Sequence, residues 1–456
     1  MIAIIKKFRD DVNIAELLKG ASATFFIRSG ALVFNFILVY LISKNFGVKE
    51  LGVYSLSLIL LQIVTVIGKM GTDTAMMRFV SEYSINRNFN SVKKMSRLAL
   101  SIILPFSVIL SFFVFFYSDK IAVLVFNKNY LTPFLKIAAI GIVPNVFLFL
   151  NVERIRGLKQ IKYYSFFYFL SVPLFTSVLL GVSILLLNGI VHPLIAYILS
   201  VILSSVLSLF IWTRKFDFIK KKFKDSSIGS DLSKVSYLPL MKLALPLLMT
   251  KSLMLLMGWA DTIMLGIFRS TFEVGLYRVP LRISMISSIF LIAFNSILGP
   301  KLTELWEKGK IDELQRIMKL STAFIFWASL PLFLILLVFR DQFLGIFGAE
   351  FKTVSLALIL LLLGQFVNSF VGSVSLLLMV TKRQVVIQNV MFIGTFINIL
   401  INYFMIPVYG INGAAFASMT SIIFINVIPL LLVKKYFGFF SISLRALLFR
   451  PEILKK

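Results

Sequence analysis

Two basic residues lie deep inside long apolar stretches, where a charge is costly. Lys251 lies roughly ten residues into the stretch Met241–Phe268, about 15 Å from its start and close to the middle of a bilayer. Arg28 lies in the apolar stretch 21–43, at the matching place in the first half of the chain. A charge held at this depth is costly enough to suggest a function, and Arg offers an anion a planar fork of donors whereas Lys offers a point charge. Alternatively, Arg28 snorkels to an interface about 12 Å away, and Lys251 pairs with Asp261.

Other polar residues within the apolar stretches suggest further chemistry. Asp261 lies toward the outer end of its stretch, where it could take up a proton or a cation, or could only anchor the helix at the interface. Arg78 and Lys301 follow apolar stretches on the inner side, where they could meet an anionic ligand first or could only fix the topology. Neutral carboxamides supply hydrogen-bond donors and acceptors to a ligand, and helix packing in lipid uses the same groups. The residues of this kind are Asn35, Gln365, Asn368, Asn398 and Asn402.

The composition indicates an integral membrane protein. Of the 456 residues, 59% are hydrophobic, against about 45–50% in soluble proteins. The chain has no Cys and a single His, His192, so the sequence predicts neither disulfides, thiolate nucleophiles nor His/Cys metal sites. No metal and no cofactor are expected.

Hydropathy predicts twelve membrane spans. Their approximate ranges are 21–43, 51–70, 97–118, 131–151, 163–187, 193–213, 241–268, 283–300, 317–339, 355–380, 385–406 and 412–433. The fold class predicted from them is an all-α integral membrane protein.

The basic residues predict the orientation of these spans. With the N-terminus inside, the inner segments hold 34 of the 47 Lys and Arg residues, as expected from the bias of basic residues toward the cytoplasm. Both termini are therefore expected in the cytoplasm. The net charge of +27 is explained by this topology, and since no appended basic domain is present, nucleic acid is not an expected partner.

The two halves of the sequence look like repeats of each other. Glu50–Tyr54 (ELGVY) recurs as Glu273–Tyr277 (EVGLY), at the same offset that separates Arg28 from Lys251 and Arg78 from Lys301. Because each half has six spans, both halves start inside and are related by an axis along the membrane normal. The expected parts are an interfacial helix (1–20), a first lobe (21–213), a basic cytoplasmic linker (214–240), a second lobe (241–433) and a basic cytoplasmic tail (434–456).

Several motifs resemble those of a known family. Phe46–Tyr54 followed by Gly71–Tyr83 resembles the first-lobe signature of bacterial polysaccharide and O-antigen flippases, and Asp261–Gly266 with Glu273–Tyr277 resembles its second-lobe counterpart. These flippases share a superfamily with the multidrug and toxin extruders and the lipid II flippase, so the resemblance implies two pseudo-symmetric six-helix lobes. Lipid II flippases normally have fourteen spans, two more than predicted here, and drug extruders carry more acidic residues in their spans.

The resemblance implies a transporter without covalent chemistry. Its cargo would be an undecaprenyl-diphosphate-linked oligosaccharide, moved by alternating access from the cytoplasmic to the outer leaflet of a bacterial inner membrane for O-antigen, lipopolysaccharide, capsule or exopolysaccharide synthesis. Polymerase or glycosyltransferase machinery would be its partners, and the chain would act as a monomer. The substrate-binding residues would be Arg28, Lys251, Asn35, Arg78, Lys301, Asn398 and Asn402, with Asp261 as the coupling residue. The alternatives are a multidrug cation antiporter of the same superfamily, a major-facilitator permease and a membrane-bound polysaccharide polymerase or ligase.

Overall fold

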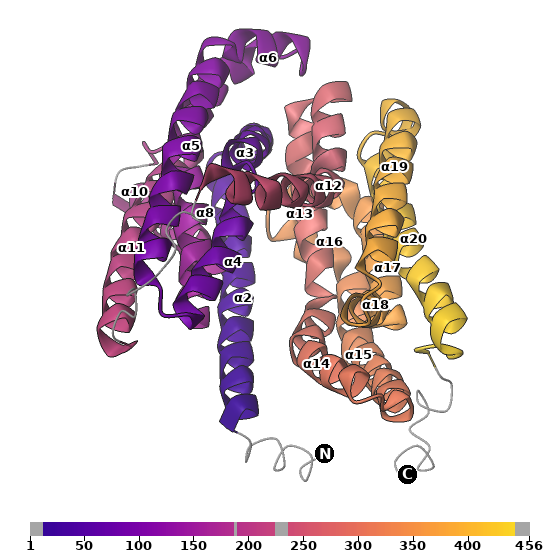
Figure 1. Ribbon diagram of the computed structural model, residues 1–456. Helices are drawn as coiled ribbons and strands as arrows, with labels where there is room; N and C mark the ends of the chain where they lie inside the picture. The colour runs from indigo at the N-terminus through magenta and orange to yellow at the C-terminus, as the bar shows by residue number, and fades with distance from the viewer. Residues whose placement is uncertain (1–11, 187–188, 224–235, 443–456) are drawn as a thin grey trace. The chain divides into compact units, whose positions relative to one another are not determined.

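The described part of the chain consists of helices joined by short turns. The computed structural model describes residues 12–186, 189–223 and 236–442, and within these ranges there is no strand (Figure 1). Lipid offers no hydrogen-bond partners, so a segment that crosses it must satisfy its backbone internally, as a helix does. The all-α class predicted from the sequence is confirmed.

The contacts divide the chain into two compact units. The first comprises Met1–Gly47 and Val53–Leu255, and the second comprises Val48–Gly52 and Leu256–Lys456. The boundary at Leu255 falls inside a helix, α12. The division at a linker 214–240 remains a prediction, since residues 224–235 lie outside the described part.

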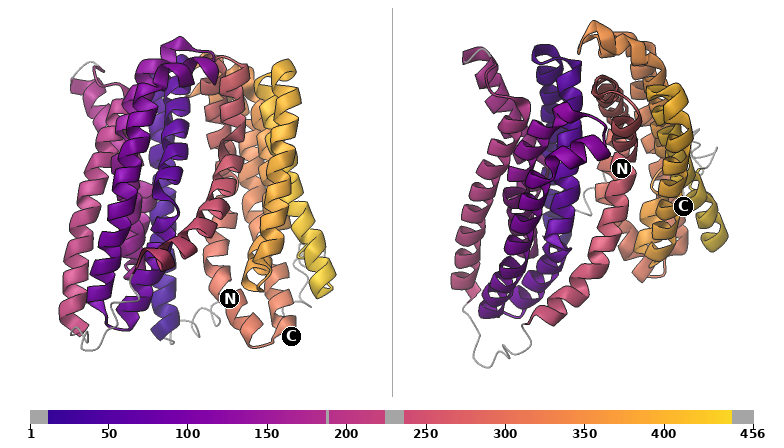
Figure 2. Two further views of the ribbon diagram at one scale, coloured as in Figure 1. Left: turned by 45° about the horizontal axis from the view of Figure 1, so that its top comes forward. Right: turned by 90° about the horizontal axis from the view of Figure 1, so that it is seen from above.

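The first unit is built around α8, which packs against α4, α5 and α11 (Figures 1 and 2). The helices of this unit are α2 (Val12–Asn45), α3 (Val48–Lys69) from Val53 onward, α4 (Thr72–Ile85), α5 (Phe89–Phe116), α6 (Ser118–Leu124), η1 (Asn129–Leu131), α7 (Thr132–Ile140), α8 (Ile142–Gly157), α9 (Ile161–Ser165), the π-helical η2 (Phe166–Leu170), α10 (Ser171–Leu186), α11 (Pro193–Phe223) and the first part of α12 (Tyr237–Phe268).

The second unit is built around α20, which packs along α17 and α19 (Figures 1 and 2). Besides the rest of α12, its helices are α13 (Thr271–Ile286), α14 (Ile289–Glu307), α15 (Ile311–Val338), α16 (Arg340–Gly345), η4 (Ala349–Val354), α17 (Ser355–Val371), α18 (Val374–Val380), α19 (Gln384–Tyr409) and α20 (Ile411–Phe437).

The helices agree with a multi-span membrane protein. Among the described residues, nine helical stretches are long and apolar enough to cross a membrane, or ten with the bent pair α13 and α14. One of the nine, Gln384–Phe437, contains both α19 and α20. Each of the twelve predicted spans overlaps a helix or a run of consecutive helices, so the structure is consistent with twelve.

Several helices extend beyond the spans that hydropathy predicts. Arg154, expected in an inner loop, lies in α8 and is only 2% exposed, and its guanidinium donates to the carbonyl of Ser96 and to Asn151. The segment 78–97, also expected as a loop, contains most of α4 and the start of α5. Hydropathy falls where charged residues begin, whereas helical hydrogen bonding continues past them. Of the predicted interfacial helix, residues 1–11 lie outside the described part, and from Val12 the chain is continuous with α2.

Two glycines allow a close backbone approach inside the second unit. A Cβ added at Gly52 would lie 1.8 Å from the carbonyl oxygen of Thr271, and one added at Gly275 would lie 2.0 Å from that of Val48. Gly52 corresponds to Gly275, and Val48 to Thr271, at the offset of the predicted repeat. The starts of α3 and α13 therefore cross at equivalent positions, with no room for a side chain on either glycine.

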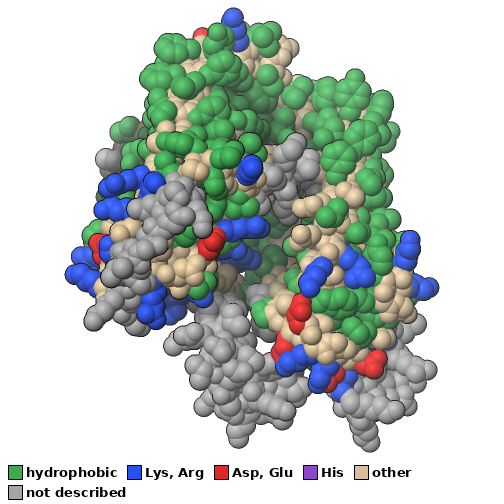
Figure 3. Space-filling model, viewed as in Figure 1, with side chains coloured by type: hydrophobic (Ala, Val, Ile, Leu, Met, Phe, Trp, Pro, Cys, Tyr) green, Lys and Arg blue, Asp and Glu red, His purple; other side chains and the backbone are tan. Residues whose placement is uncertain are grey.

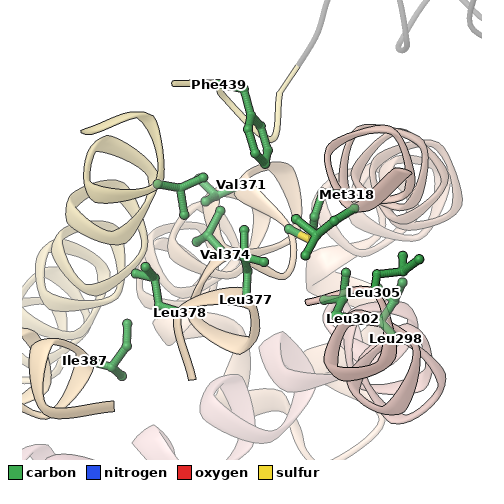
Figure 4. Close-up of a cluster of buried hydrophobic side chains, with 12 residues drawn as sticks. Leu298, Leu302, Leu305, Met318, Val371, Val374, Leu377, Leu378, Ile387 and Phe439 are labelled. Carbon is green, nitrogen blue, oxygen red and sulfur yellow. The ribbon is translucent and has the colours of Figure 1, made fainter. Parts of the chain in front are cut away.

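A buried apolar cluster joins the helices of the second unit. Leu298 and Leu302 of α14 and Met318 of α15 face Val374 and Leu377 of α18, as Figure 4 shows. Phe439, which follows α20, covers this cluster. Since lipid is as apolar as these side chains, it is close packing rather than exclusion of water that holds such helices together within the membrane.

Basic side chains gather at one end of each unit. Figure 3 shows Lys and Arg toward the lower end of both units, with hydrophobic side chains over most of the visible surface above them. In the second unit this is the end where α14 turns into α15 (Figure 1). Basic residues are expected on the cytoplasmic side of a membrane protein, so the orientation predicted from the sequence would place these ends inside.

Candidate functional site

The second unit contains a buried carboxylate held by four hydrogen bonds. Asp261 of α12 is 7% exposed. Its Oδ1 accepts from Nδ2 of Asn398 at 2.9 Å and from Nδ2 of Asn402 at 2.7 Å. Its Oδ2 accepts from the hydroxyl of Tyr277 at 2.9 Å and from that of Ser418. These partners come from α13, α19 and α20, so the carboxylate joins four helices.

Helical spacing explains how α19 contributes two of these donors. Asn398 and Asn402 are four residues apart and share one face of the helix. The second Nδ2 proton of Asn402 goes to Oδ1 of Asn398 at 3.0 Å, and Asn398 also reaches Ser421 of α20 at 3.4 Å. With both of its Nδ2 protons donated in this way, Asn402 has a buried Oδ1 without a hydrogen-bond partner among the described residues. We call Asp261, Tyr277, Asn398, Asn402 and Ser418 the Asp261 network.

All four partners of Asp261 are neutral donors. They solvate the ionised carboxylate, but they do not cancel its charge, and a buried charge without a counter-ion is expensive. Each of the two carboxylate oxygens accepts two of these hydrogen bonds. The network therefore combines one negative charge with several neutral oxygen atoms, including the unpartnered Oδ1 of Asn402. Such a set can hold a proton or a monovalent cation.

The network argues against an interfacial role for Asp261. A carboxylate that only anchored the helix at the membrane surface would be exposed to water, whereas this one is buried and bonded to three other helices.

No group of three or more His, Cys, Asp or Glu side chains that could hold a metal ion exists among the described residues.

Arg28, the predicted cation of the first unit, packs within that unit. Its guanidinium carbon lies 4.3 Å from the ring centre of Phe169 in η2, a cation–π distance. Tyr164 is close enough to interact electrostatically with Arg28, Glu153 and Arg156. No described carboxylate forms an ion pair with Arg28, and its buried Nε has no hydrogen-bond partner among the described residues. Arg28 thus retains donor capacity for an anion.

None of the four hydrogen bonds to Asp261 among the described residues comes from the other predicted site residues. Asn35 donates to the carbonyl of Ala31 in its own helix at 2.8 Å. Arg78 is exposed on α4. Lys301 is bound to Glu304 at 3.0 Å. The backbone of Lys251 lies in α12, but its side chain is outside the described part.

Two members of the network have no role in the sequence-based prediction. Tyr277 is fully buried, and its place in the repeated ELGVY-like motif is a signal that could have identified it. Ser418 lies in a run of small residues that gives no such signal. Only the fold shows that these two hydroxyls and two asparagines converge on one carboxylate.

Comparisons with known proteins fit this architecture. The family model of polysaccharide biosynthesis proteins matches residues 17–306, and a second one, MatE, matches residues 246–404. The chain belongs to the polysaccharide biosynthesis protein family. The resemblance seen in its motifs is thereby confirmed at the level of the family.

Two curated relatives of this chain come from Haloferax volcanii. The probable low-salt glycan biosynthesis flippase Agl15 is 27% identical over 165 residues, 36% of this chain and 35% of that protein. The probable flippase AglR is 28% identical over 170 residues, with the same shares. The matches span about a third of each relative.

Several transporters of known structure share the fold of this chain. The lipid II flippase MurJ in an inward closed conformation has a TM-score of 0.70 at 16% identity, covering 94% of this chain and 89% of that one. An inward-facing multidrug transporter of the MATE family has a TM-score of 0.69 at 12% identity, covering 92% and 98%. A MOP superfamily transporter from Pyrococcus furiosus reaches 0.62 at 13% identity, covering 94% and 97%.

Proposed function

We propose that this protein is a flippase that moves a lipid-linked oligosaccharide across the membrane by alternating access. The observation that carries the proposal is the guanidinium of Arg28, which lies in a predicted span, packs on Phe169 and has no carboxylate partner among the described residues. A cation in this state suits a phosphate or diphosphate headgroup. The family and the flippase relatives support this kind of cargo.

The finer parts of the proposal come from the sequence. The carrier lipid is undecaprenyl diphosphate, the chain lies in a bacterial inner membrane with both termini in the cytoplasm, and transport runs toward the outer leaflet. Lys251 acts with Arg28 on the diphosphate. Arg78 and Lys301 receive the headgroup first, and Asn35 contributes to sugar binding. Glycosyltransferases or a polymerase act before or after the transport step, and the glycan becomes O-antigen, capsule or exopolysaccharide.

Asp261 is proposed to couple transport to an ion. Its carboxylate alternates between the network of four neutral donors and a state that carries a proton or a monovalent cation. Uptake of a positive charge neutralises Asp261 and weakens its hold on Asn398 and Asn402. Because these side chains belong to α19, the charge state of Asp261 changes how α12 and α19 are joined.

The test replaces the two membrane-embedded cations. The double variant Arg28→Gln/Lys251→Gln is expected to lose translocation of lipid-linked oligosaccharide in vesicles while it still inserts into the membrane in normal amounts. Lys310→Gln is the control, because Lys310 is exposed and paired with Glu313. Translocation by the double variant at the wild-type rate would remove the proposed anion site.

A cation antiporter is the second candidate function. It is favoured by the MatE match over residues 246–404 and by the buried charge of Asp261, which lies within that match. Such a protein would export lipophilic cations, and Arg28 would repel them. Efflux of a fluorescent lipophilic cation that depends on Asp261 but is unaffected by Arg28→Gln would support the antiporter over the flippase.

A further inference from the structure

The second unit contains a cavity of about 310 Å³, separate from the Asp261 network. It lies between α14, the junction of α17 and α18, α19 and α20. Its volume is at the lower end for ligand pockets in proteins, about 300–1,000 Å³. Half of its lining residues carry neutral hydrogen-bonding side chains: Asn295, Gln365, Asn368, Ser373, Ser375 and Asn426.

Two buried atoms in the lining lack hydrogen-bond partners among the described residues. One is Oγ of Ser373, a residue only 2% exposed, and the other is Oδ1 of Asn295. Buried polar atoms in native proteins are nearly always paired with protein or with a bound molecule. The hydroxyl of Ser373 can donate and Oδ1 of Asn295 can accept, so a ligand hydroxyl can pair with either atom.

The carboxamides of the lining are ordered by local bonds that leave them capacity for a ligand. Nδ2 of Asn368 donates to Oε1 of Gln365 at 3.2 Å, and Nδ2 of Asn426 donates to the carbonyl of Ile422 at 2.8 Å. Each of these amide nitrogens has a second proton. The side chains are therefore held in place before any ligand arrives.

None of the described residues that line the cavity is charged. An ionised group in this cavity would be buried without a counter-ion, which excludes the diphosphate part of the proposed cargo as its ligand. The remaining wall is apolar and includes Leu376, Met391 and Ile425. Neutral donors and acceptors beside an apolar wall match a sugar ring, which has hydroxyls at its edge and C–H groups on its faces.

A break in a helix shapes the cavity. Gly372 follows the last residue of α17 with φ of +78°, the turn brings Ser373 into the lining, and Ser375 lines the cavity from the first turn of α18. Interrupted membrane helices commonly form binding sites in transporters. On α19, Met391 of the cavity and Asn398 of the Asp261 network are seven residues apart, roughly 10 Å along the helix.

We propose that this cavity binds one uncharged sugar ring of the transported glycan. The assignment rests on the proposed function for the identity of the cargo, and it adds where the second unit recognises the sugar. In this proposal the basic residues hold the anion of the cargo, and the cavity selects for a sugar ring of its glycan.

The experiment uses the absence of Cys from the natural chain. The purified full-length Ser373→Cys variant is treated with a small thiol reagent, with and without methyl glycosides of glucose, galactose, mannose and N-acetylglucosamine at tens of millimolar. We expect at least one glycoside to slow labelling threefold or more, and methyl glucuronide to protect less because it is charged. Ser369→Cys is the matched control: Ser369 is as buried as Ser373 but lies outside the lining, so no glycoside should change its labelling.

Two outcomes would overturn the proposal. One is that no glycoside slows the labelling of Ser373→Cys, which would leave the cavity to water. The other is that cyclohexylmethanol, which lacks adjacent hydroxyls, protects as well as the best glycoside. If Ser373→Cys does not fold, Ser375→Cys provides the same readout. Labelling does not require transport, so its result is independent of the translocation test of Arg28 and Lys251.

Discussion

Each unit contains a buried aspartate, and the two aspartates differ in whether their partner carries a positive charge. In the first unit, Asp73 is 2% exposed and pairs with Lys69 at 3.1 Å. Lys69 ends α3 and Asp73 begins α4, so each charge is also favoured by the dipole of its own helix. The ammonium of Lys69 lies 4.4 Å from the ring centre of Phe149. In the second unit, Asp261 lies within α12, away from the helix ends, and its described partners are four neutral donors.

The difference separates a structural charge from an exchangeable one. The negative charge of Asp73 is already cancelled by a residue of the protein, so a mobile ion would have to displace Lys69. The charge of Asp261 is stabilised but not cancelled, so a proton or cation can join it without displacing a cation of the network. This contrast supports placing ion coupling in the second unit.

Replacement of Asp73 by Asn is expected to have the largest effect, and the effect is on folding. It leaves Lys69 buried without its carboxylate, which costs about 3–5 kcal/mol. The double variant Lys69→Met/Asp73→Leu should recover most of that stability, because apolar pairs often replace buried ion pairs without loss. Thermal denaturation of the purified variants measures both. If Asp73→Asn is as stable as the wild type, the pair is not structural and the contrast between the units fails.

Replacement of Asp261 by Asn should act on transport more than on stability. The variant keeps the shape of the side chain but has no charge to bind an ion, and we expect translocation to fall about tenfold to hundredfold, or about 1.4–2.8 kcal/mol. The new amide group faces donors, so a stability loss of about 1–3 kcal/mol accompanies it. Asp312→Asn, at an exposed acidic residue in the first turn of α15, is the control. Wild-type translocation by Asp261→Asn would show that this carboxylate only joins helices.

Replacement of Tyr277 by Phe gives the smallest expected effect and tests the neutral donors. It removes one of four hydrogen bonds to Asp261 and adds no charge. A loss of about 1 kcal/mol corresponds to a change of about fivefold in translocation or in the apparent affinity for the coupling ion. Measuring translocation against ion concentration and against pH separates these two quantities. An unchanged dependence on both would mean that Tyr277 does not influence the charge of Asp261.

Sequence reasoning succeeded where a signal was local or regularly spaced. Long apolar runs predicted where the membrane helices lie, and the constant offset between matching motifs predicted a repeat that reappears in the crossing of Gly52 and Gly275. It also selected Asp261, Asn398 and Asn402 as candidates, because polar residues in apolar stretches are conspicuous. Their assembly into one network depends on contacts between helices that are far apart in the sequence, which no local pattern contains.

Other features were missed because hydropathy treats every charge alike. Lys69 falls near the end of the predicted span 51–70, and hydropathy does not show that it is buried against Asp73 and Phe149. Arg154 falls between the predicted spans 131–151 and 163–187, whereas α8 carries it into the interior of its unit. In both cases a neighbouring helix supplies a partner that makes burial possible, and that partner is visible only in the folded chain.

The crossing of α3 and α13 has a consequence for how this sequence can vary. Neither Gly52 nor Gly275 can gain a side chain unless the backbone of the opposite helix gives way, so keeping one glycine cannot compensate for losing the other. A substitution at either position therefore has the same structural consequence: the starts of the two helices must move apart.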